Sequence, residues 1–401
     1  MRIVVDLQAA QTESKFRGIG RYSLALAREM AKNRGGHELL IALNGLFPES
    51  IEPIRAAFDG ILAQDNICVW YVPGPVRECE RKNDWRRQAA ENIREAYLAS
   101  LYPDIIHVSS LFEGYAQDAV TSIGVFDHET PVFVTLYDLI PLVYSRQYLN
   151  PYPDFAHHYK RKTWALRKAR GWLCISESTM REAEVYLGER AGCKVNISSA
   201  CDDFFKKIHI SPTEEERIRQ RFNLDRPFLL YTGGGDWRKN LEGFLRAFAL
   251  LSPELRGSHQ IVFAGRMLDR DVKHLERTAK RVGLSVTQLV FPGYVSDREL
   301  LFLYNLCSLF VFPSKHEGFG LPVLEAMQCE VPVICGNTSS LPEVMGYAEC
   351  LFDPTSERDI AAKIEQALID DSFRRACIHH NRKHAQKFSW KASALRSIAA
   401  F

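Results

Sequence analysis

Two glutamates, Glu317 and Glu325, flank a glycine-containing turn with seven residues between them. The apolar run at 309–312 before them predicts a buried strand. The run at 321–327 has helical composition, with Pro322 in its first turn. A helix N-terminus offers free N–H groups and the positive end of a dipole, which suit a diphosphate. Two carboxylates beside such a turn suit sugar hydroxyls, a ribose on one side and a hexose on the other.

A second junction of strand, glycine loop and helix is predicted earlier in the same half of the chain. The apolar run at 228–232 leads into three glycines at 233–235, and Arg238 and Lys239 follow shortly after. A helix is expected to open at these two cations. Three glycines let the backbone approach a phosphate, and cations at a helix start would face its charge. The alternative is a surface turn with exposed cations.

The turn at 317–325 reads Glu-Gly-Phe-Gly-Leu-Pro-Val-Leu-Glu, and it resembles the E-x7-E signature of the retaining glycosyltransferases of family GT4. This resemblance implies an α/β fold of the GT-B class, with two Rossmann-like domains facing each other across a cleft. It also implies transfer of a hexose from a nucleotide-sugar donor. The run Gly-Gly-x-Asp-x-Arg-Lys-Asn at 233–240 is similar to that of mannosyltransferases of bacterial polysaccharide assembly. The expected donor is therefore GDP-mannose, and the expected acceptor is a glycan or lipid-linked glycan such as an O-antigen.

The resemblance also suggests a role for each of these residues. Lys239 matches the family lysine, and Arg238 is expected to replace the family arginine, because Gly234 stands where that arginine often sits. Both would neutralise the departing diphosphate, while Glu317 holds the hexose and Glu325 the ribose. The remaining donor contacts are expected at Gly233, Gly234, Tyr294, Val295, Gly318, Phe319, Gly320 and Leu321. No D-x-D motif is placed for a metal, so no metal ion or other cofactor is expected.

The N-terminal half opens with a predicted strand, a glycine-containing loop at 8–20 and a helix. No G-x-G-x-x-G follows, so a dinucleotide is poorly supported. In GT4 enzymes a G-G-I-G-type loop sits here and faces the reaction centre. Arg17, Gly18, Gly20 and Arg21 are therefore expected on the acceptor side, although Arg17 stands where many members carry glycine. A helix-capping loop with exposed arginines is the alternative.

Asp138 follows the predicted strand that begins at Val132, in a run where the family has histidine and this chain has Tyr137. Ligands bind at the carboxyl ends of parallel strands, so Asp138 is grouped with the catalytic residues as a partner for the acceptor hydroxyl or the donor sugar. The alternative is a turn aspartate. A second family histidine is replaced by Ser109, and His107 is interpreted as a packed core residue.

Two segments of the N-terminal half are rich in charged residues, and their patterns are less specific than the two glycine junctions. The segment 73–94 is polar and basic, and it predicts a loop followed by a solvated helix. A predicted helix at 148–170 carries several cations beside Trp164, which suits a membrane surface or a lipid-linked diphosphate. A merely solvated helix is the alternative. These cations are Lys160, Arg161, Lys162, Arg167, Lys168 and Arg170.

The length of 401 residues indicates two domains. We expect an acceptor-side domain at 1–201, a nucleotide-sugar domain at 202–387 and a helix at 388–401 that, by resemblance, crosses back to the first. The formal net charge of +2 gives no reason to expect a nucleic-acid partner. A strand-like start, no apolar stretch of about 18 residues and ten cysteines without a C-x-x-C pair favour the cytoplasm. We also expect peripheral contact with the inner face of the membrane and a role as one module of a longer chain.

Three alternatives remain open at this point. The donor could be another nucleotide sugar, UDP- or ADP-linked. The chain could be a GT-B epimerase, which would need its own acid and base, and none is located. It could also be a non-catalytic GT-B module of a larger assembly, although such a module should have lost Lys239 or Glu317.

Overall fold

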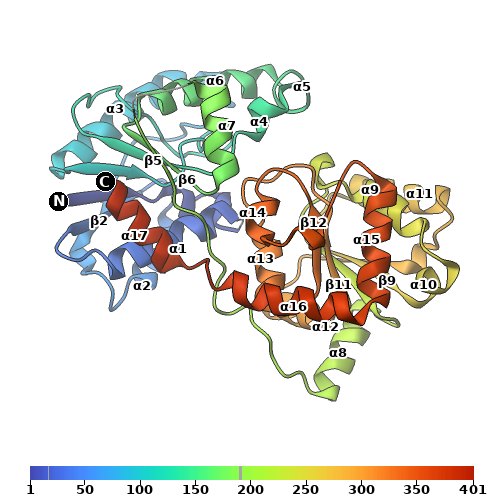
Figure 1. Cartoon of the computed structure of the whole chain (residues 1–401). Helices are drawn as coiled ribbons and strands as arrows, with labels where there is room; N and C mark the ends of the chain where they lie inside the picture. The colour runs from blue at the N-terminus through green and yellow to red at the C-terminus, as the bar shows by residue number, and fades with distance from the viewer. Residues whose placement is uncertain (17, 189–191) are drawn as a thin grey trace. The chain divides into compact units, whose positions relative to one another are not determined.

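The computed structural model describes residues 1–16, 18–188 and 192–401 and divides into two compact units. The first contains residues 1–199 and 389–401, and the second contains residues 200–388. Each unit is a parallel β-sheet covered by helices (Figure 1). Strands buried on both faces are mostly apolar, as β8 is from Phe228 to Tyr231 and β1 is from Ile3 to Val5.

Among the described residues, the sheet of the first unit has seven strands in the order β3-β2-β1-β4-β5-β6-β7. Their bounds are β1 Arg2–Asp6, β2 Glu38–Asn44, β3 Ile67–Trp70, β4 Ile105–Val108, β5 Val132–Leu136, β6 Gly171–Cys174 and β7 Cys193–Asn196. The α-helices are α1 Gly18–Lys32, α2 Pro48–Ala57, α3 Asp84–Ser100, α4 Ile140–Val143, α5 Ser145–Tyr148, α6 Pro153–Lys168, α7 Glu177–Leu187 and α17 Trp390–Ala400. Short 3-10 turns are η1 Gln8–Ala10, η2 Glu13–Phe16, η3 Gln64–Asn66 and η4 Arg81–Asn83.

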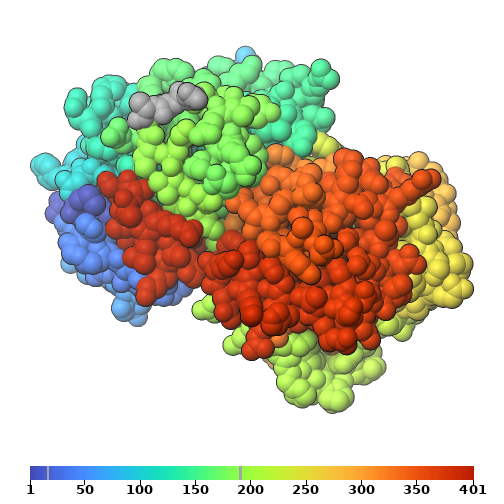
Figure 2. Space-filling model, in the orientation of Figure 1, coloured from blue at the N-terminus to red at the C-terminus, as the bar shows by residue number. Residues whose placement is uncertain are grey.

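The C-terminal helix α17 packs on α1 within the first unit. In Figure 2 it appears in red beside the blue N-terminal segment. The ring of Trp390 contacts Tyr22 edge to face, with ring centroids 5.0 Å apart. Phe401 then contacts Phe133 of β5 at 5.0 Å. The two ends of the chain are therefore joined in one hydrophobic core.

Among the described residues, the sheet of the second unit has six strands in the order β10-β9-β8-β11-β12-β13. Their bounds are β8 Phe228–Thr232, β9 Gln260–Ala264, β10 Leu289–Gly293, β11 Leu309–Phe312, β12 Val333–Gly336 and β13 Leu351–Phe352. The α-helices are α8 Pro212–Phe222, α9 Leu241–Ala249, α10 Pro253–Ser258, α11 Asp269–Arg281, α12 Asp297–Leu306, α13 Leu321–Gln328, α14 Leu341–Met345, α15 Glu357–Ile369 and α16 Asp371–Ala385. The 3-10 turns are η5 Trp237–Lys239, η6 Val286–Gln288 and η7 Ala348–Cys350.

The strand order brings the two predicted glycine junctions to one edge of the second sheet. Strands β8 and β11 are hydrogen-bonded neighbours, with Leu229 opposite Leu309 and Leu230 opposite Phe310. Because both strands run in the same direction, the segments that follow them leave from the same edge. That edge is where open α/β sheets bind ligands.

The interpretation of the two charged helices of the first unit as solvated is wrong in part. In α3, Arg94 donates from Nε to Asp6 Oδ2 at 2.7 Å, and both residues are buried. In α6, Lys162 is buried and donates to the carbonyl oxygen of Thr121 at 2.5 Å. Burial, with Arg161 nearby, lowers the pKa of Lys162 to about 7. The basic surface of α6 is therefore smaller than its sequence suggests, because charges with partners on distant segments turn inward.

Candidate functional site

Glu317, Lys239 and Arg238 form one hydrogen-bonded cluster at the edge where β8 and β11 end. The Lys239 ammonium donates to Glu317 Oε1 at 2.6 Å. Arg238 donates from Nη1 to Glu317 Oε2 at 3.0 Å and to the His316 carbonyl oxygen at 2.8 Å. Lys239 Nζ also lies 5.2 Å from the centre of the Phe312 ring. Both cations of one junction therefore bind the carboxylate of the other junction. The sequence prediction of a common site requires this arrangement.

Burial makes the charges of this cluster strongly dependent on one another. Burial alone would raise the pKa of Glu317, but Lys239 and Arg238 outweigh it and lower that pKa to about 2. Burial lowers the pKa of the Lys239 ammonium, and the Glu317 carboxylate opposes that change. Glu317 therefore stays ionised at neutral pH and holds the two cations at the site. A ligand phosphate would enter a place where positive charge is already oriented.

The turn that carries Glu317 is fixed by serine hydroxyls and by one glycine. The Glu317 backbone N–H donates to Ser339 Oγ at 2.9 Å. The Ser340 hydroxyl donates to the carbonyl oxygens of Glu317 at 3.0 Å and Phe319 at 2.8 Å. Gly320 has φ +105°, and a Cβ there would lie 2.7 Å from Leu341 Cδ2. Helix α13 then begins at Leu321 without a side-chain cap, which leaves its N-terminus suited to an anion.

The other junction differs from the prediction in one detail. Arg238 and Lys239 lie on the 3-10 turn η5, and α9 begins only at Leu241. Asn240 between them has φ +57°, which ends the turn before the helix starts. The expectation that the helix opens at the two cations is therefore wrong, because Asn readily adopts this left-handed conformation and separates the two elements. Gly233 has φ +140°, and a Cβ there would lie 2.6 Å from the Tyr231 hydroxyl oxygen.

The remaining donor-side residues lie around the same edge of the second sheet. Glu325 lies inside α13 and accepts from the Tyr304 hydroxyl at 2.7 Å. The Tyr304 oxygen is also 3.0 Å from Thr232 Oγ1. Tyr294 and Val295 follow β10, and the Tyr294 side chain is 76% exposed. Gly234, Gly318, Phe319 and Leu321 belong to the two junctions themselves; Phe319 is buried, and its ring contacts Phe388 edge to face at 5.6 Å.

The described acceptor-side residues, Gly18, Gly20, Arg21 and Asp138, belong to the first unit. Arg17 lies outside the described residues. Gly18 and Arg21 are exposed at the start of α1, while a Cβ on Gly20 would lie 2.4 Å from the Ser14 carbonyl oxygen. Asp138 Oδ1 accepts the Ile140 N–H at 3.1 Å, which is the turn role left open by the sequence.

Sequence reasoning missed a carboxylate near this loop. Glu113 accepts from Ser14 Oγ at 2.9 Å, from Thr12 Oγ1 at 3.1 Å and from Ser110 Oγ at 3.3 Å. Burial raises its pKa, and the three hydroxyls oppose that change. The only signal in the sequence is its position shortly after the strand that ends at Val108. Tyr137 and His107, by contrast, are packed: the Tyr137 hydroxyl lies 2.7 Å from Ser23 Oγ, and His107 Nε2 lies 2.8 Å from Thr135 Oγ1.

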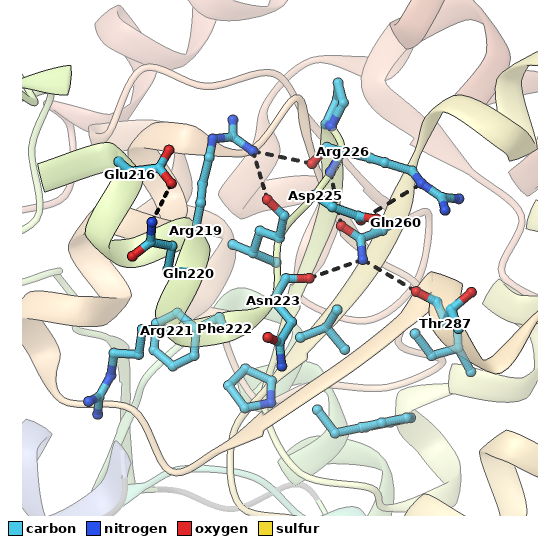
Figure 3. A pocket seen from close by; sticks show the side chains of 16 residues that line it. Glu216, Arg219, Gln220, Arg221, Phe222, Asn223, Asp225, Arg226, Gln260 and Thr287 are labelled. Carbon is cyan, nitrogen blue, oxygen red and sulfur yellow. Dashed lines mark hydrogen bonds and ion pairs between the residues drawn. The ribbon is translucent and has the colours of Figure 1, made fainter. Parts of the chain in front are cut away.

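A hollow of about 1230 Å³ is lined by α8 and the segment 223–227 after it, by the first residue of β9 and by β10 as far as Pro292 (Figure 3). There the Gln260 amide donates to the carbonyl oxygens of Asn223 at 3.2 Å and Thr287 at 3.3 Å. Arg219 donates to Glu215 at 2.7 Å and to backbone carbonyls. Apart from its wall along β10, this hollow lies at the amino ends of the strands, whereas the cation–carboxylate cluster lies past the carboxyl ends of β8 and β11. Its size therefore does not make it the site of chemistry.

Two parallel-sheet Rossmann-like units, with an arginine, a lysine and a glutamate gathered at a glycine junction, define a GT-B fold with a site suited to a sugar diphosphate. The family profile described as "Glycosyl transferases group 1" matches residues 212–384, and the one described as "Glycosyltransferase Family 4" matches residues 16–195. The chain is 30% identical over 391 residues to the O-antigen chain mannosyltransferase B of Escherichia coli, covering 96% of this chain and 95% of that protein. It belongs to the GT4 family of glycosyltransferases, as its motifs predict.

Longer relatives and solved structures are also similar to this chain. The chain is 35% identical over 402 residues to the serotype-specific mannosyltransferase WbdA of E. coli, covering 100% of this chain and 48% of that protein. It thus spans about half the length of the WbdA proteins that it matches. A sucrose-phosphate synthase from Thermosynechococcus elongatus has a TM-score of 0.70 at 18% identity, covering 99% of this chain and 97% of that one. Anabaena HepE, solved with UDP and glucose, has a TM-score of 0.66 at 18% identity, covering 99% and 98%. These structures confirm the predicted fold class.

Proposed function

We propose that this chain transfers mannose from GDP-mannose to a growing, lipid-linked glycan such as an O-antigen and retains the anomeric configuration. The observation that carries the proposal is the partly buried Lys239–Glu317–Arg238 cluster on the segment that leads into α13. Relatives that are 30–35% identical over most of the chain bear the names mannosyltransferase and O-antigen mannosyltransferase, which favours mannose over another hexose.

In this proposal the two cations act on the leaving group. As the bond between the sugar C1 and the phosphate oxygen breaks, negative charge builds up on the GDP β-phosphate. Lys239 and Arg238 are already oriented and partly shielded from water, so they stabilise that charge without reorganising. We assign the neutralising role to these side chains and include no metal ion or other cofactor. Among the described residues, no group of three or more His, Cys, Asp or Glu side chains could hold a metal ion.

In this proposal the two glutamates hold the donor, and residues of the first unit bind the acceptor. Glu317 holds the hexose hydroxyls near C1, and Glu325 holds the ribose hydroxyls of GDP. The acceptor hydroxyl attacks C1 on the face that the diphosphate leaves, and its proton passes to the departing phosphate oxygen. Retention then needs no covalent enzyme intermediate. Asp138 and the loop that contains Gly18, Gly20 and Arg21 are proposed to position the acceptor.

We also propose peripheral contact with an anionic membrane surface through α6. Among the described residues, no helix combines the length and the apolar character that a membrane span needs. On α6, Trp164 is 58% exposed and lies between exposed Lys160 and Lys168, with Lys168 Nζ 3.9 Å from the centre of its ring. Such an aromatic–basic face suits an anionic interface. The double variant Lys160→Glu/Lys168→Glu should lose cosedimentation with anionic vesicles; equal sedimentation of variant and wild type would disprove the contact.

The enzymatic proposal is tested with a panel of nucleotide sugars. Each donor is incubated with the protein and a mannose-terminated glycan, and release of nucleoside diphosphate is measured. We expect GDP release from GDP-mannose, dependent on the acceptor and insensitive to EDTA, with an α-linked product by NMR if the donor is α-configured. Release of UDP or ADP instead would replace the donor, and an inverted product would rule out retention. If no donor is turned over, with or without acceptor, the chain is a non-catalytic module.

A further inference from the structure

A second, smaller hollow of about 420 Å³ borders the loop that carries the two cations. Its walls come from this loop, from α9 and α11 and from the segment 354–357, all within the second unit. Helix α9 packs against both α11 and α15 (Figure 1). The lining includes Asp236 and Trp237, whereas the side chains of Arg238 and Lys239 bond to Glu317. The hollow is therefore separate from the cation–carboxylate cluster, and its volume falls in the range typical of small-ligand sites, about 300–1,000 Å³.

Trp237 gives this hollow an exposed aromatic wall. It is 42% exposed, although its neighbour Lys239 in the same 3-10 turn has its side chain largely buried. An indole offers a wide apolar face together with an N–H donor. The face of a sugar ring that carries axial C–H groups packs well on such a surface. Because its ring is largely apolar and its N–H is polar, tryptophan is enriched at binding interfaces.

The polar groups opposite Trp237 are held in place by one another. His274 Nε2 lies 2.5 Å from Glu242 Oε1, and Arg246 donates from Nη2 to Glu242 Oε2 at 3.0 Å. Arg246 also donates from Nη1 to Glu357 at 3.3 Å. Because these groups are already ordered, hydrogen bonds to ligand hydroxyls would require little further loss of side-chain freedom.

Two glycines and an asparagine build the walls of the hollow. A Cβ on Gly235 would lie 3.1 Å from Asp271 Cβ, so the glycine lets the loop approach α11 closely. A Cβ on Gly243 would lie 2.6 Å from Asn240 Oδ1. The Asn240 amide in turn donates to the Pro354 carbonyl oxygen at 2.7 Å. The loop is thereby fixed against both α9 and the segment that precedes α15.

The charges of the lining exclude the other common ligands. Acidic groups outnumber basic ones, which disfavours a second phosphate or nucleotide. The acidic residues are Asp236, Glu242, Asp271 and Glu357, and the lysine and arginine are Lys315 and Arg246. No metal-binding group of three or more side chains is found in the part of the chain that the structure describes. An apolar ligand would leave these charges without water. A neutral ligand rich in hydroxyls fits all three conditions.

We propose that this hollow binds one saccharide unit of the glycan chain outside the transfer site. Trp237 lies under the sugar ring, and Glu242, Asp271 and His274 bond to its hydroxyls. This inference rests on the proposed function, because the ligand is the chain that the reaction extends. A second contact keeps that chain close to the enzyme between transfers, since binding at one site raises the effective concentration at the other.

The test is calorimetric titration of the full chain with a short linear mannan oligosaccharide. We expect saturable binding, and Trp237→Ala should weaken it about tenfold or more, because it removes the stacking surface. The matched control is Trp85→Ala, which truncates a 66% exposed tryptophan on α3 and should change the affinity less than about twofold. His274→Ala, on a different element, should weaken binding as well.

The outcomes separate this inference from the proposed function. If the wild-type protein transfers mannose but binds no oligosaccharide, the saccharide site is disproved and the transfer reaction stands. Binding that survives both Trp237→Ala and His274→Ala also disproves the site, because the chain is then held elsewhere. If no donor is turned over, the transferase proposal fails, while Trp237-dependent oligosaccharide binding still supports the saccharide site.

Discussion

Substitution of Lys239 by alanine is expected to lower kcat for sugar transfer about 10²–10³-fold, the loss seen when one preorganised donor to a developing oxyanion is removed. The Lys239 ammonium is fixed by Glu317 Oε1 at 2.6 Å and has the Phe312 ring beside it. It therefore meets the leaving diphosphate without rearrangement, in a place where water screens its charge poorly. The measurement is kcat from GDP release at saturating donor and acceptor.

Two further variants separate charge from fold in this experiment. Lys239→Arg keeps a cation at the position and should retain more activity than Lys239→Ala. Lys280→Ala removes an exposed cation from α11 of the same unit and should change kcat less than about twofold. The circular dichroism spectrum confirms that each variant is folded. A folded Lys239→Ala protein with wild-type kcat would show that the leaving group is stabilised elsewhere.

Lys239→Ala should also change how the free energy of unfolding depends on pH. The ordinary pKa of Glu317 is 4.5, and in the folded chain it is lowered to about 2. The stabilisation it contributes is thus present above pH 4.5 and is lost as the pH falls through about 2, because in this window the unfolded chain binds more protons. With Lys239 removed, the pKa is lowered less and the loss is shallower. Urea unfolding of both proteins from about pH 5 to about pH 3.5 measures the difference; parallel curves would show that Lys239 does not hold the charge of Glu317.

The parts of the site that could be predicted from the sequence are those specified locally. Strand β8 has the predicted bounds, 228–232, because an apolar run between glycine and charged residues fixes both of its ends. Helix α8 begins at Pro212 after a Ser211 cap, whose hydroxyl accepts the Glu214 N–H at 3.3 Å, and a serine three residues before a glutamate specifies such a cap locally. Once two such junctions follow adjacent parallel strands, topology alone brings Arg238 and Glu317 to one edge.

The parts that could not be predicted depend on partners distant in sequence. Nothing in the run around Glu325 indicates that the Tyr304 hydroxyl bonds to it, because the partner lies on another helix. The same holds for Arg161, which bonds to Glu91 at 2.8 Å from 70 residues further along the chain. A prediction from residue charge alone places such residues in water. Their hydrogen bonds become visible only when both partners are placed.

Glu330 shows how a local rule can hold with an unusual residue. A residue in the left-handed conformation just after a helix is most often glycine. The structure has φ +55° at Glu330, directly after α13 and its C-cap residue Cys329. Its N–H donates to the Met327 carbonyl oxygen at 3.1 Å, and the Val331 N–H to that of Ala326 at 3.5 Å. This is the Schellman pattern that ends helices, so the turn is kept although the glycine is not.

Substitution of Arg94 by methionine is expected to lower the free energy of unfolding by about 3–5 kcal/mol, because it leaves the buried Asp6 carboxylate without its cation. Both residues are 1% exposed, and the Arg94 Nε–Asp6 Oδ2 distance is 2.7 Å. Arg94 also donates to the Ser122 carbonyl oxygen at 3.2 Å. Asp6 then keeps the hydrogen bond from the Gln8 amide, at 3.0 Å, which cannot neutralise a charge. Urea unfolding followed by the fluorescence of the first unit gives the measurement.

An exposed ion pair of the same unit provides the control, because its donor–acceptor distance is almost the same as that of the buried pair. Arg81 donates to Asp154 at 2.8 Å, but the two side chains are 85% and 63% exposed. Arg81→Met should therefore cost less than about 1 kcal/mol. The double variant Asp6→Leu/Arg94→Met should recover most of the stability, because it removes the stranded charge together with its partner. If Arg94→Met costs no more than Arg81→Met, or if the double variant is less stable than Arg94→Met alone, the Asp6 carboxylate is not the source of the loss, and burial of this pair does not govern the stability of the first unit.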